Sequence, residues 1–336
     1  MRAAPAVDLL TGSMLFRDTF LAGGRGHVDL PRLEATGYRA IGLTVATTWP
    51  DVQGRLSRWH FRSLGLSPSA VGSPFAVAQW LIGRVERLCE ESGGRLVIVR
   101  SRADLEPCLA PSGPIGVLLG VQGGHVLEGD LRKVGRLREL GVRMFAPAHV
   151  MDNDVVGSAT GKSATGVTDY GRAVIAEVAA QAMIVDLAHM SPAGIEAVLP
   201  RLTGPFALSH AAIRDEAVRP GRLRRFGPAT RNVPAAVARE VGARGGLFGV
   251  VLSTQLLGGS TLADAGAMIR RALDAAGDAN VGIGSDMDGA LRMVIDVEGL
   301  PALVDALLAS GLNESVVSGF VGANAVRFLR EALPIS

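Results

Sequence analysis

The feature that most constrains this chain is the alternation of short, continuous apolar runs with amphipathic stretches of helical period, which extends over almost its whole length. Nine apolar runs have the length of buried strands: 4–10, 40–46, 96–99, 115–121, 142–149, 183–189, 206–210, 247–252 and 281–285. The helical patterns between them include 75–92, 169–182, 192–202, 234–242 and 262–276. Continuous apolar strands separated by helices predict a parallel sheet that helices cover on both faces.

Two architectures share this alternation, a (β/α)8 TIM-type barrel and an open, doubly wound sheet. Residues that can do chemistry follow several successive strands, namely Gln122, His149, His189, His210 and Asp286. In a barrel all such strand ends surround one mouth. A doubly wound sheet would gather them at one switch point and normally has a glycine-rich phosphate turn after the first strand, which 11–14 (TGSM) is not. We therefore predict a (β/α)8 TIM-type barrel with additional C-terminal helices, from 299–333, packed outside it.

Nine strand candidates are one more than a barrel needs, and we expect the short run 96–99 to be the extra one. No linker, low-complexity tract or short-period repeat interrupts the pattern. This continuity predicts a single domain over residues 1–336.

Composition narrows the classes of partner. Lys and Arg number 34 against 32 Asp and Glu, so the net charge of +2 is too small for a nucleic-acid-binding surface. The uncharged runs 63–83 and 107–127 contain several Pro, Gly and Ser residues, which argues against a bilayer helix, and residues 1–10 do not resemble a secretory signal. Cys89 in an apparent helix and Cys108 in a proline-flanked turn lack a metal-binding spacing and indicate reduced thiols. We expect a cytoplasmic protein that binds neither nucleic acid nor a membrane.

Two of the six histidines end consecutive predicted strands, His189 and His210. Neighbouring parallel strands lie about 5 Å apart, which lets two such imidazoles share one metal ion. The alternative is that each imidazole caps its strand or binds a backbone carbonyl. With Asp286 at a further strand end, we favour a functional site.

Residues 282–289 (GIGSDMDG) place two carboxylates, Asp286 and Asp288, two positions apart. On an extended segment both would point to the same side, toward the barrel mouth, so Asp288 is a candidate for substrate binding. One carboxylate at such a place can orient a water molecule and move its proton. The alternative for Asp288 is that it caps the next element in a glycine-rich turn.

Several segments together resemble the ordered motifs of the renal or membrane dipeptidase family, which belongs to the metal-dependent amidohydrolase barrels. The segments are 185–191 (VDLAHMS), 208–211 (LSHA), Arg231-Asn232, 282–289 and 322–330 (GANAVRFLR), with 121–125 (VQGGH) and 147–153 (PAHVMDN) in the same order. The resemblance extends over roughly residues 4 to 332. It implies hydrolysis of dipeptides at a zinc centre.

The resemblance also implies roles for individual residues. His189 and His210 would be metal ligands, and Asp286 would carry the proton. His149 would stabilise the oxyanion, and Arg231 would hold a substrate carboxylate, which suits its planar guanidinium.

Three expected metal ligands are different in this chain. The family's Asp-Gly-His-x-Asp motif on the first strand is replaced by 8–12 (DLLTG), so that Leu10 and Gly12 stand where ligands are expected. The family's bridging Glu is Gln122, which offers a neutral amide oxygen. Two imidazoles and one amide are a poor donor set for zinc. We therefore predict at most one zinc ion, held by His189, His210 and Gln122.

Other histidines and motifs compete with this interpretation. His27-Val28-Asp29 has the spacing of the lost ligand pair, but Asp29 followed by Pro31 is typical of a helix start. His125 follows two glycines near the expected site without an assigned role, and we expect His60 to pack with its aromatic neighbours. The segment 157–163 (GSATGKS) resembles a phosphate loop but has three residues between its glycines instead of four.

The prediction from sequence is a dipeptidase-like metallohydrolase that cleaves dipeptides or related small amides. One alternative is a catalytically impaired relative that binds a small carboxylate. Another is metal-free chemistry with Asp286 and His149 as acid and base. The sequence leaves open the substrate, its stereochemistry and the oligomeric state, although the resemblance and the apolar C-terminal helices are compatible with a homodimer.

Overall fold

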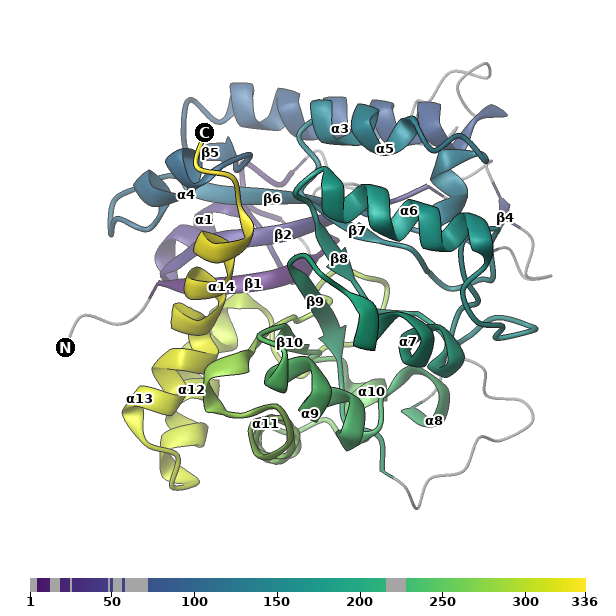
Figure 1. Ribbon diagram of the computed structural model, residues 1–336. Coiled ribbons are helices and arrows are strands. Elements are labelled where there is room, and N and C mark those ends of the chain that lie inside the picture. The colour runs from purple at the N-terminus through teal and green to yellow at the C-terminus, as the bar shows by residue number, and fades with distance from the viewer. Residues whose placement is uncertain are drawn as a thin grey trace.

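The computed structural model describes residues 5–12, 19–24, 26–47, 49–50, 56–57, 72–215 and 228–336. A closed ring of eight parallel strands forms its centre, and helices surround the ring (Figure 1). In order around the ring, the strands are β1 (Ala6–Thr11), β2 (Tyr38–Ala46), β6 (Ile115–Gln122), β7 (Met144–Ala146), β8 (Ile184–Asp186), β9 (Phe206–Ala211), β10 (Leu247–Val250) and β11 (Val281–Ile283). The pairing of β11 with β1, at Ile283 and Asp8, closes the ring. The predicted (β/α)8 barrel is confirmed.

The ninth strand, β5 (Leu96–Ile98), lies beside the ring. It pairs with the first three residues of β6, while β7 pairs with β6 on the same side at Gly120–Gln122. On its other side, β6 pairs with β2 from Gly116 to Gln122, so the ring closes without β5. The expectation that 96–99 is the extra strand is confirmed. A separate antiparallel pair joins β3 (Trp49–Pro50) to β4 (Leu56–Ser57).

The helices follow the strands in the order that the sequence predicts. They are α1 (Leu30–Ala35), α3 (Pro74–Glu91), α4 (Arg102–Cys108), α5 (Lys133–Glu139), α6 (Asp169–Ala180), α7 (Pro192–Val198), α8 (Pro228–Arg231), α9 (Ala235–Ala243), α10 (Thr254–Leu257), α11 (Leu262–Ala276), α12 (Leu300–Ala309), α13 (Glu314–Ser318) and α14 (Asn324–Ala332). Many begin at a side chain that accepts a hydrogen bond from the first turn, as Asp29 does from Arg32 N and Thr168 from Gly171 N. The helix-capping interpretation of Asp29 is therefore confirmed. None of the helices in the described ranges combines the length and the apolar character that a membrane crossing requires.

Cys108 is a correction to the sequence prediction. It is the last residue of α4 and not part of a turn, although Pro107 precedes it inside the helix. The Ser101 side chain accepts a hydrogen bond from Asp104 N, and this cap starts the helix six residues before the proline. Pro107 therefore falls in the last turn, where its missing N–H cannot bond to the Ala103 carbonyl, and the helix ends one residue later. Cys89 lies in α3, as predicted.

The barrel has two apolar cores. A large one fills the space between the outer face of the strands and the surrounding helices. A smaller one lies inside the barrel at the amino-terminal ends of the strands, where Val7, Leu118 and Leu247 meet Phe328 and Leu329 of α14. The C-terminal helix thus closes the lower end of the barrel, and only the carboxyl-terminal end of the strands remains to form a site. This is the end where TIM-type barrels carry their chemistry.

Two glycines let three strands approach closely below that end. A Cβ atom added at Gly249 of β10 would come within 1.9 Å of the Ser209 carbonyl oxygen of β9, and one at Gly284 within 1.8 Å of the same atom. Any side chain at either position would have to displace the backbone of β9. The backbone of Ser209 therefore packs against the backbone of β10 and of the residue that follows β11.

Candidate active site

A cavity of about 330 Å³ opens at the carboxyl-terminal end of the barrel. Its lining comes from the ends of many strands and the loops that follow them: Leu10, Thr11, Gly12, Thr44, Ala46, Gln122, His149, Val150, Thr160, His189, Arg231, Leu256, Asp286, Asp288, Gly289, Ala290 and Leu291. Six of the seven residues that the sequence singles out line it. The seventh, His210, contacts the cavity residue His189. The prediction that groups from several strand ends meet at one mouth of the barrel is confirmed.

His189 and His210 face each other with their Nε2 atoms 3.0 Å apart. His210 is in β9, whereas His189 is three residues beyond the end of β8, in the left-handed region at φ 65°. Two nitrogen ligands of one tetrahedral zinc ion would lie roughly 3.3 Å apart, given zinc–nitrogen bonds of about 2.0–2.1 Å. The two imidazoles are therefore close to the arrangement in which both could ligate a single ion.

A buried hydrogen-bond chain orients His210. Its Nδ1 lies 2.8 Å from Ser209 Oγ, which donates to Asp186 Oδ2 at 2.6 Å. Because the Ser209 proton goes to the carboxylate, Ser209 Oγ can only accept from His210, which places the imidazole proton on Nδ1. The His210 Nε2 atom then presents a lone pair to the cavity, the form in which a histidine ligates a metal.

Asp186 also holds the loop that carries His189. Its Oδ1 accepts hydrogen bonds from Ala188 N at 3.0 Å and from Ser209 N at 2.9 Å. Asp186 and Ser209 are completely buried. A single carboxylate at the end of β8 thus positions both imidazoles.

His149 completes a row of three imidazoles. Its ring centroid lies 4.9 Å from that of His189, which in turn lies 4.9 Å from that of His210. Burial is the largest influence on all three imidazoles: it lowers the pKa of His149 to about 3 and the pKa values of His189 and His210 well below the usual range. The positive charge of Arg231 acts in the same direction on all three. All three are neutral at physiological pH. The Nδ1 atoms of His149 and His189 are buried without a hydrogen-bond partner in the described part of the chain.

Asp286 lies three residues beyond β11, at φ 62°. Its backbone N–H donates to the Leu10 carbonyl at 3.1 Å, which fixes the loop against the end of β1. Burial raises the pKa of Asp286 to about 7; Arg231 opposes this rise and Asp8 adds to it. A carboxyl group that titrates near neutral pH in a cavity is suited to accept and release a proton.

Arg231 ends the short helix α8 and is 6% exposed. Its Nη2 donates to the His210 carbonyl at 2.8 Å, the one hydrogen bond that its guanidinium makes within the described ranges. Burial lowers its pKa to about 10, and Asp286 and Asp186 oppose that effect. The guanidinium is therefore charged at physiological pH and has donors to offer to an anionic group.

The sequence prediction for Asp288 needs correction in its geometry. Asp288 lines the cavity beside Asp286, but the segment is not extended, because both residues have positive φ angles of 61° and 62°. Its carboxylate accepts from His27 N at 3.0 Å and from Val28 N at 3.2 Å, and it lies 2.9 Å from His27 Nδ1. Asp288 therefore secures the loop before α1 instead of capping the element that follows it.

The three positions where the sequence predicts changed metal ligands surround this cavity. Leu10, Gly12 and Gln122 all line it, and the Gln122 amide nitrogen is buried without a partner among the described residues. Within the same ranges, no three or more His, Cys, Asp or Glu side chains are grouped in a way that could hold a metal ion. The donors that converge there are two imidazoles.

The competing motifs lie outside this constellation. His125 Nε2 lies 2.8 Å from Thr47 Oγ1, and His60 falls outside the described residues. The amides of Ser158 and Ser163 in the phosphate-loop-like segment donate to the carboxylate of Asp152, so these donors are already occupied. Nucleotide binding by that segment has no structural support.

Sequence reasoning missed Asp8, Asp186 and Ser209. Asp8 is buried in β1, and burial raises its pKa to about 6, although hydrogen bonds from Ser285 and Leu10 oppose the rise. The sequence signal that could have found the two aspartates is a lone carboxylate inside an apolar strand, as in 184–188 (IVDLA). Such a carboxylate indicates a structural or functional role, because charged side chains are rarely fully buried unless they are paired.

Comparison with known proteins agrees with the fold and with the family that the sequence resembles. Residues 5–335 match the family described as Membrane dipeptidase (Peptidase family M19). Dipeptidase aclJ of Aspergillus oryzae is 29% identical over 321 residues, 90% of this chain and 69% of that protein. Human dipeptidase 3 is 29% identical over 330 residues, 91% of this chain and 64% of that protein, so the chain spans just under two thirds of the human relative.

Solved structures share the fold. The crystal structure of dipeptidase AC, a family M19 metallopeptidase, superimposes with a TM-score of 0.80 at 22% identity, covering 98% of this chain and 99% of that one. A metallopeptidase from Rhodobacter sphaeroides, liganded with a phosphinate mimic of the dipeptide L-Ala-D-Ala, gives the same values. Family membership and these relatives support a metal-dependent, dipeptidase-type hydrolase. The chain belongs to the membrane dipeptidase family, peptidase family M19.

Proposed function

We propose that this protein hydrolyses dipeptides or related small amides and that it holds at most one metal ion. The observation that carries the proposal is the convergence of His189 Nε2 and His210 Nε2, 3.0 Å apart, at the cavity that the buried Arg231 also lines. A site that combines metal-binding imidazoles with a guanidinium suits a small substrate that has both an amide bond and a carboxylate.

The donor set supports one ion and not two. His189, His210 and the amide oxygen of Gln122 would hold the first ion. A second ion would need ligands from the end of β1, where Leu10 and Gly12 have none. With no anionic ligand in the set, we expect the affinity for zinc to be modest.

The roles that we propose for Arg231, Asp286 and His149 do not depend on the number of bound metal ions. Arg231 would hold the substrate carboxylate and so orient the scissile amide. Asp286, whose pKa is about 7, would take a proton from the attacking water and deliver it to the leaving amine. The neutral His149 would donate a hydrogen bond to the developing oxyanion. A bound metal ion would supply Lewis acidity and lower the pKa of water.

The test is a metal analysis of protein purified without chelator, followed by a dipeptide panel with added zinc, cobalt or manganese. The ligand of the Rhodobacter sphaeroides relative makes L-Ala-D-Ala a reasonable first substrate. Near-stoichiometric metal, with turnover that His189→Ala abolishes, is the expected result. Absence of both metal and turnover would refute the proposal. A carboxylate ligand that then raised the melting temperature would favour the alternative, an impaired relative that binds a small carboxylate.

A further inference from the structure

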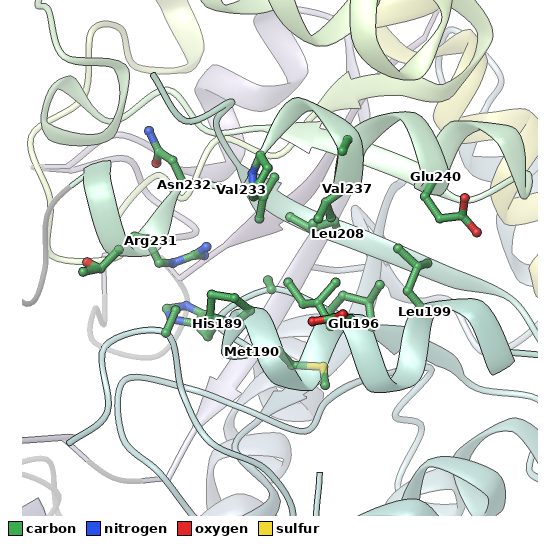
Figure 2. Close-up of a pocket in the computed structure, with 18 of the residues that line it drawn as sticks. His189, Met190, Glu196, Leu199, Leu208, Arg231, Asn232, Val233, Val237 and Glu240 are labelled. Carbon is green, nitrogen blue, oxygen red and sulfur yellow. The ribbon is translucent and has the colours of Figure 1, made fainter. Parts of the chain in front are cut away.

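A second cavity lies directly behind the active site, in a groove between α7 and α9 (Figure 2). Its volume is about 330 Å³, as large as that of the catalytic cavity. The two cavities share a wall, because His189 and Arg231 line both. His189 and Arg231 therefore lie where the two cavities adjoin.

The groove is apolar along its length and acidic at its rim. Ile195 of α7 and Val237 of α9 both line it, and Figure 2 shows Leu199, which directly follows α7, on the side opposite Val237. Glu196 and Glu240 project from the same two helices and are exposed to solvent. Neither carboxylate forms an ion pair or a hydrogen bond within the described part of the chain. The groove thus has aliphatic walls and two exposed carboxylates, and the guanidinium of Arg244, one turn after Glu240 in the sequence, donates to the backbone carbonyl of Leu199 in the same lining.

The inner end of the groove has the opposite charge. Figure 2 shows Arg231 and His189 at one end, and Leu199 and Glu240 at the other. The Arg231 guanidinium is buried, and its one hydrogen bond within the described ranges goes to the His210 carbonyl. It can still donate to an anionic group. A ligand that matches this sequence of environments has a carboxylate, then an aliphatic chain, then a cation.

We propose that the groove binds the long basic side chain, of lysine or arginine type, of the C-terminal residue of the dipeptide substrate. This proposal rests on the proposed function, in which Arg231 holds the carboxylate of that same residue. The side chain then starts next to Arg231 and runs between α7 and α9. Its methylene groups contact Ile195 and Val237, and its cationic end reaches Glu196 and Glu240.

The two parts of such a side chain contribute unequally. Each buried methylene stabilises binding by about 0.8 kcal/mol, so the three extra methylenes of norleucine over alanine predict a gain in kcat/KM of roughly tenfold or more. An exposed ion pair is weak, so the two glutamates together should favour lysine over norleucine only about 3- to 20-fold. The apolar wall therefore determines affinity, and the rim determines the preference for a cation.

The test measures kcat/KM for Ala-Ala, Ala-norleucine, Ala-Lys and the reversed dipeptide Lys-Ala, with the C-terminal residue in both configurations. The expected order is Ala-Lys above Ala-norleucine above Ala-Ala. Lys-Ala should gain no such advantage, because its basic side chain lies on the other residue. Equal values for Ala-Lys and Ala-Ala would overturn the proposal.

Variants connect the preference to the rim. The double variant Glu196→Gln/Glu240→Gln should lower the ratio of Ala-Lys to Ala-norleucine by about 3- to 20-fold. Glu91→Gln, which removes one exposed carboxylate at the end of α3, is the control and should leave that ratio unchanged. An unchanged ratio in the double variant would show that the cation does not reach the groove.

Calorimetric binding of the same dipeptides separates this proposal from the proposed function. If no dipeptide is hydrolysed but Ala-Lys binds at least several-fold more tightly than Ala-norleucine, and the double variant removes the difference, the proposed function is wrong and the groove assignment stands. If dipeptides are hydrolysed and neither assay distinguishes Ala-Lys from Ala-Ala, the groove assignment is wrong and the proposed function stands.

Discussion

Replacing Asp186 by asparagine should reverse the proton arrangement under the active site while leaving the fold intact. The asparagine Oδ1 can still accept from Ala188 N and Ser209 N, which lie 3.0 and 2.9 Å from the carboxylate. The second oxygen, 2.6 Å from Ser209 Oγ, becomes an NH2 group, which can only donate. Ser209 must then turn its hydroxyl proton toward His210 Nδ1, which forces the imidazole proton onto Nε2.

The magnitudes follow from this exchange. Two of the three hydrogen bonds to Asp186 remain and the third changes direction, so we expect the free energy of unfolding to fall by only about 1 kcal/mol. His210 Nε2 loses the lone pair that a metal needs, and changes of this kind behind a metal ligand reduce metal affinity by roughly 10- to 100-fold. Asp186→Ala, by contrast, leaves buried donors unsatisfied and should destabilise the protein by about 1–3 kcal/mol for each.

The assay is long-range proton–nitrogen NMR on protein labelled at histidine nitrogen, which reports the tautomer directly and needs no bound metal. The wild-type protein should carry the His210 proton on Nδ1, and Asp186→Asn should carry it on Nε2. Zinc titration against a chromophoric chelator then measures the affinity, with urea unfolding as the control for stability. Identical tautomers in the two proteins would refute the role assigned to Asp186 and Ser209.

Three further predictions concern the cavity. Gln122→Glu should raise zinc affinity by about tenfold or more, because it adds an anionic ligand; unchanged affinity in the chelator competition would mean that this side chain does not face the ion. Arg231→Lys should raise KM for dipeptides by about tenfold with a smaller change in kcat, because lysine lacks the planar pair of donors; a change in kcat alone would contradict carboxylate binding. Burial raises the pKa of Asp8 to about 6, so the stability that this carboxyl contributes in metal-free protein should be fully present below about pH 4 and lost as the pH rises through 6. Asp8→Asn should remove this loss, which is about 3 kcal/mol at pH 8 for a rise in pKa from 3.8 to about 6, as measured by urea unfolding; equal pH dependence in both proteins would show that the carboxyl titrates normally.

The sequence predicted the barrel because its evidence is distributed over the whole chain. Strands buried on both sides must be continuously apolar, and helices that cover them must be amphipathic. Each strand and each helix therefore indicates the same parallel, helix-covered sheet. Strand ends were less accurate. The run 142–149 predicted a strand up to His149, but β7 ends at Ala146, where Pro147 has no N–H group to continue the ladder.

The sequence predicted which residues line the site, but it did not predict the backbone conformation that positions them. Strand order brings His189, His210 and Asp286 to one mouth, and this follows from topology alone. The left-handed backbone at Asp286 and Asp288 does not, because it depends on hydrogen bonds between that loop and residues near positions 10 and 27. Nor could the sequence reveal the groove between α7 and α9, whose shape depends on how two helices pack.

The close packing of Gly249 and Gly284 against Ser209 has a consequence for how this site can change over evolutionary time. The floor beneath His210 is made of main chain from three strands, and a side chain there would force those strands apart. Substitutions at the upper rim, for example at Leu10, Gly12 or Gln122, can therefore occur without disturbing the support below. A barrel built in this way can lose or regain ligands one position at a time while the height and spacing of its remaining histidines stay the same.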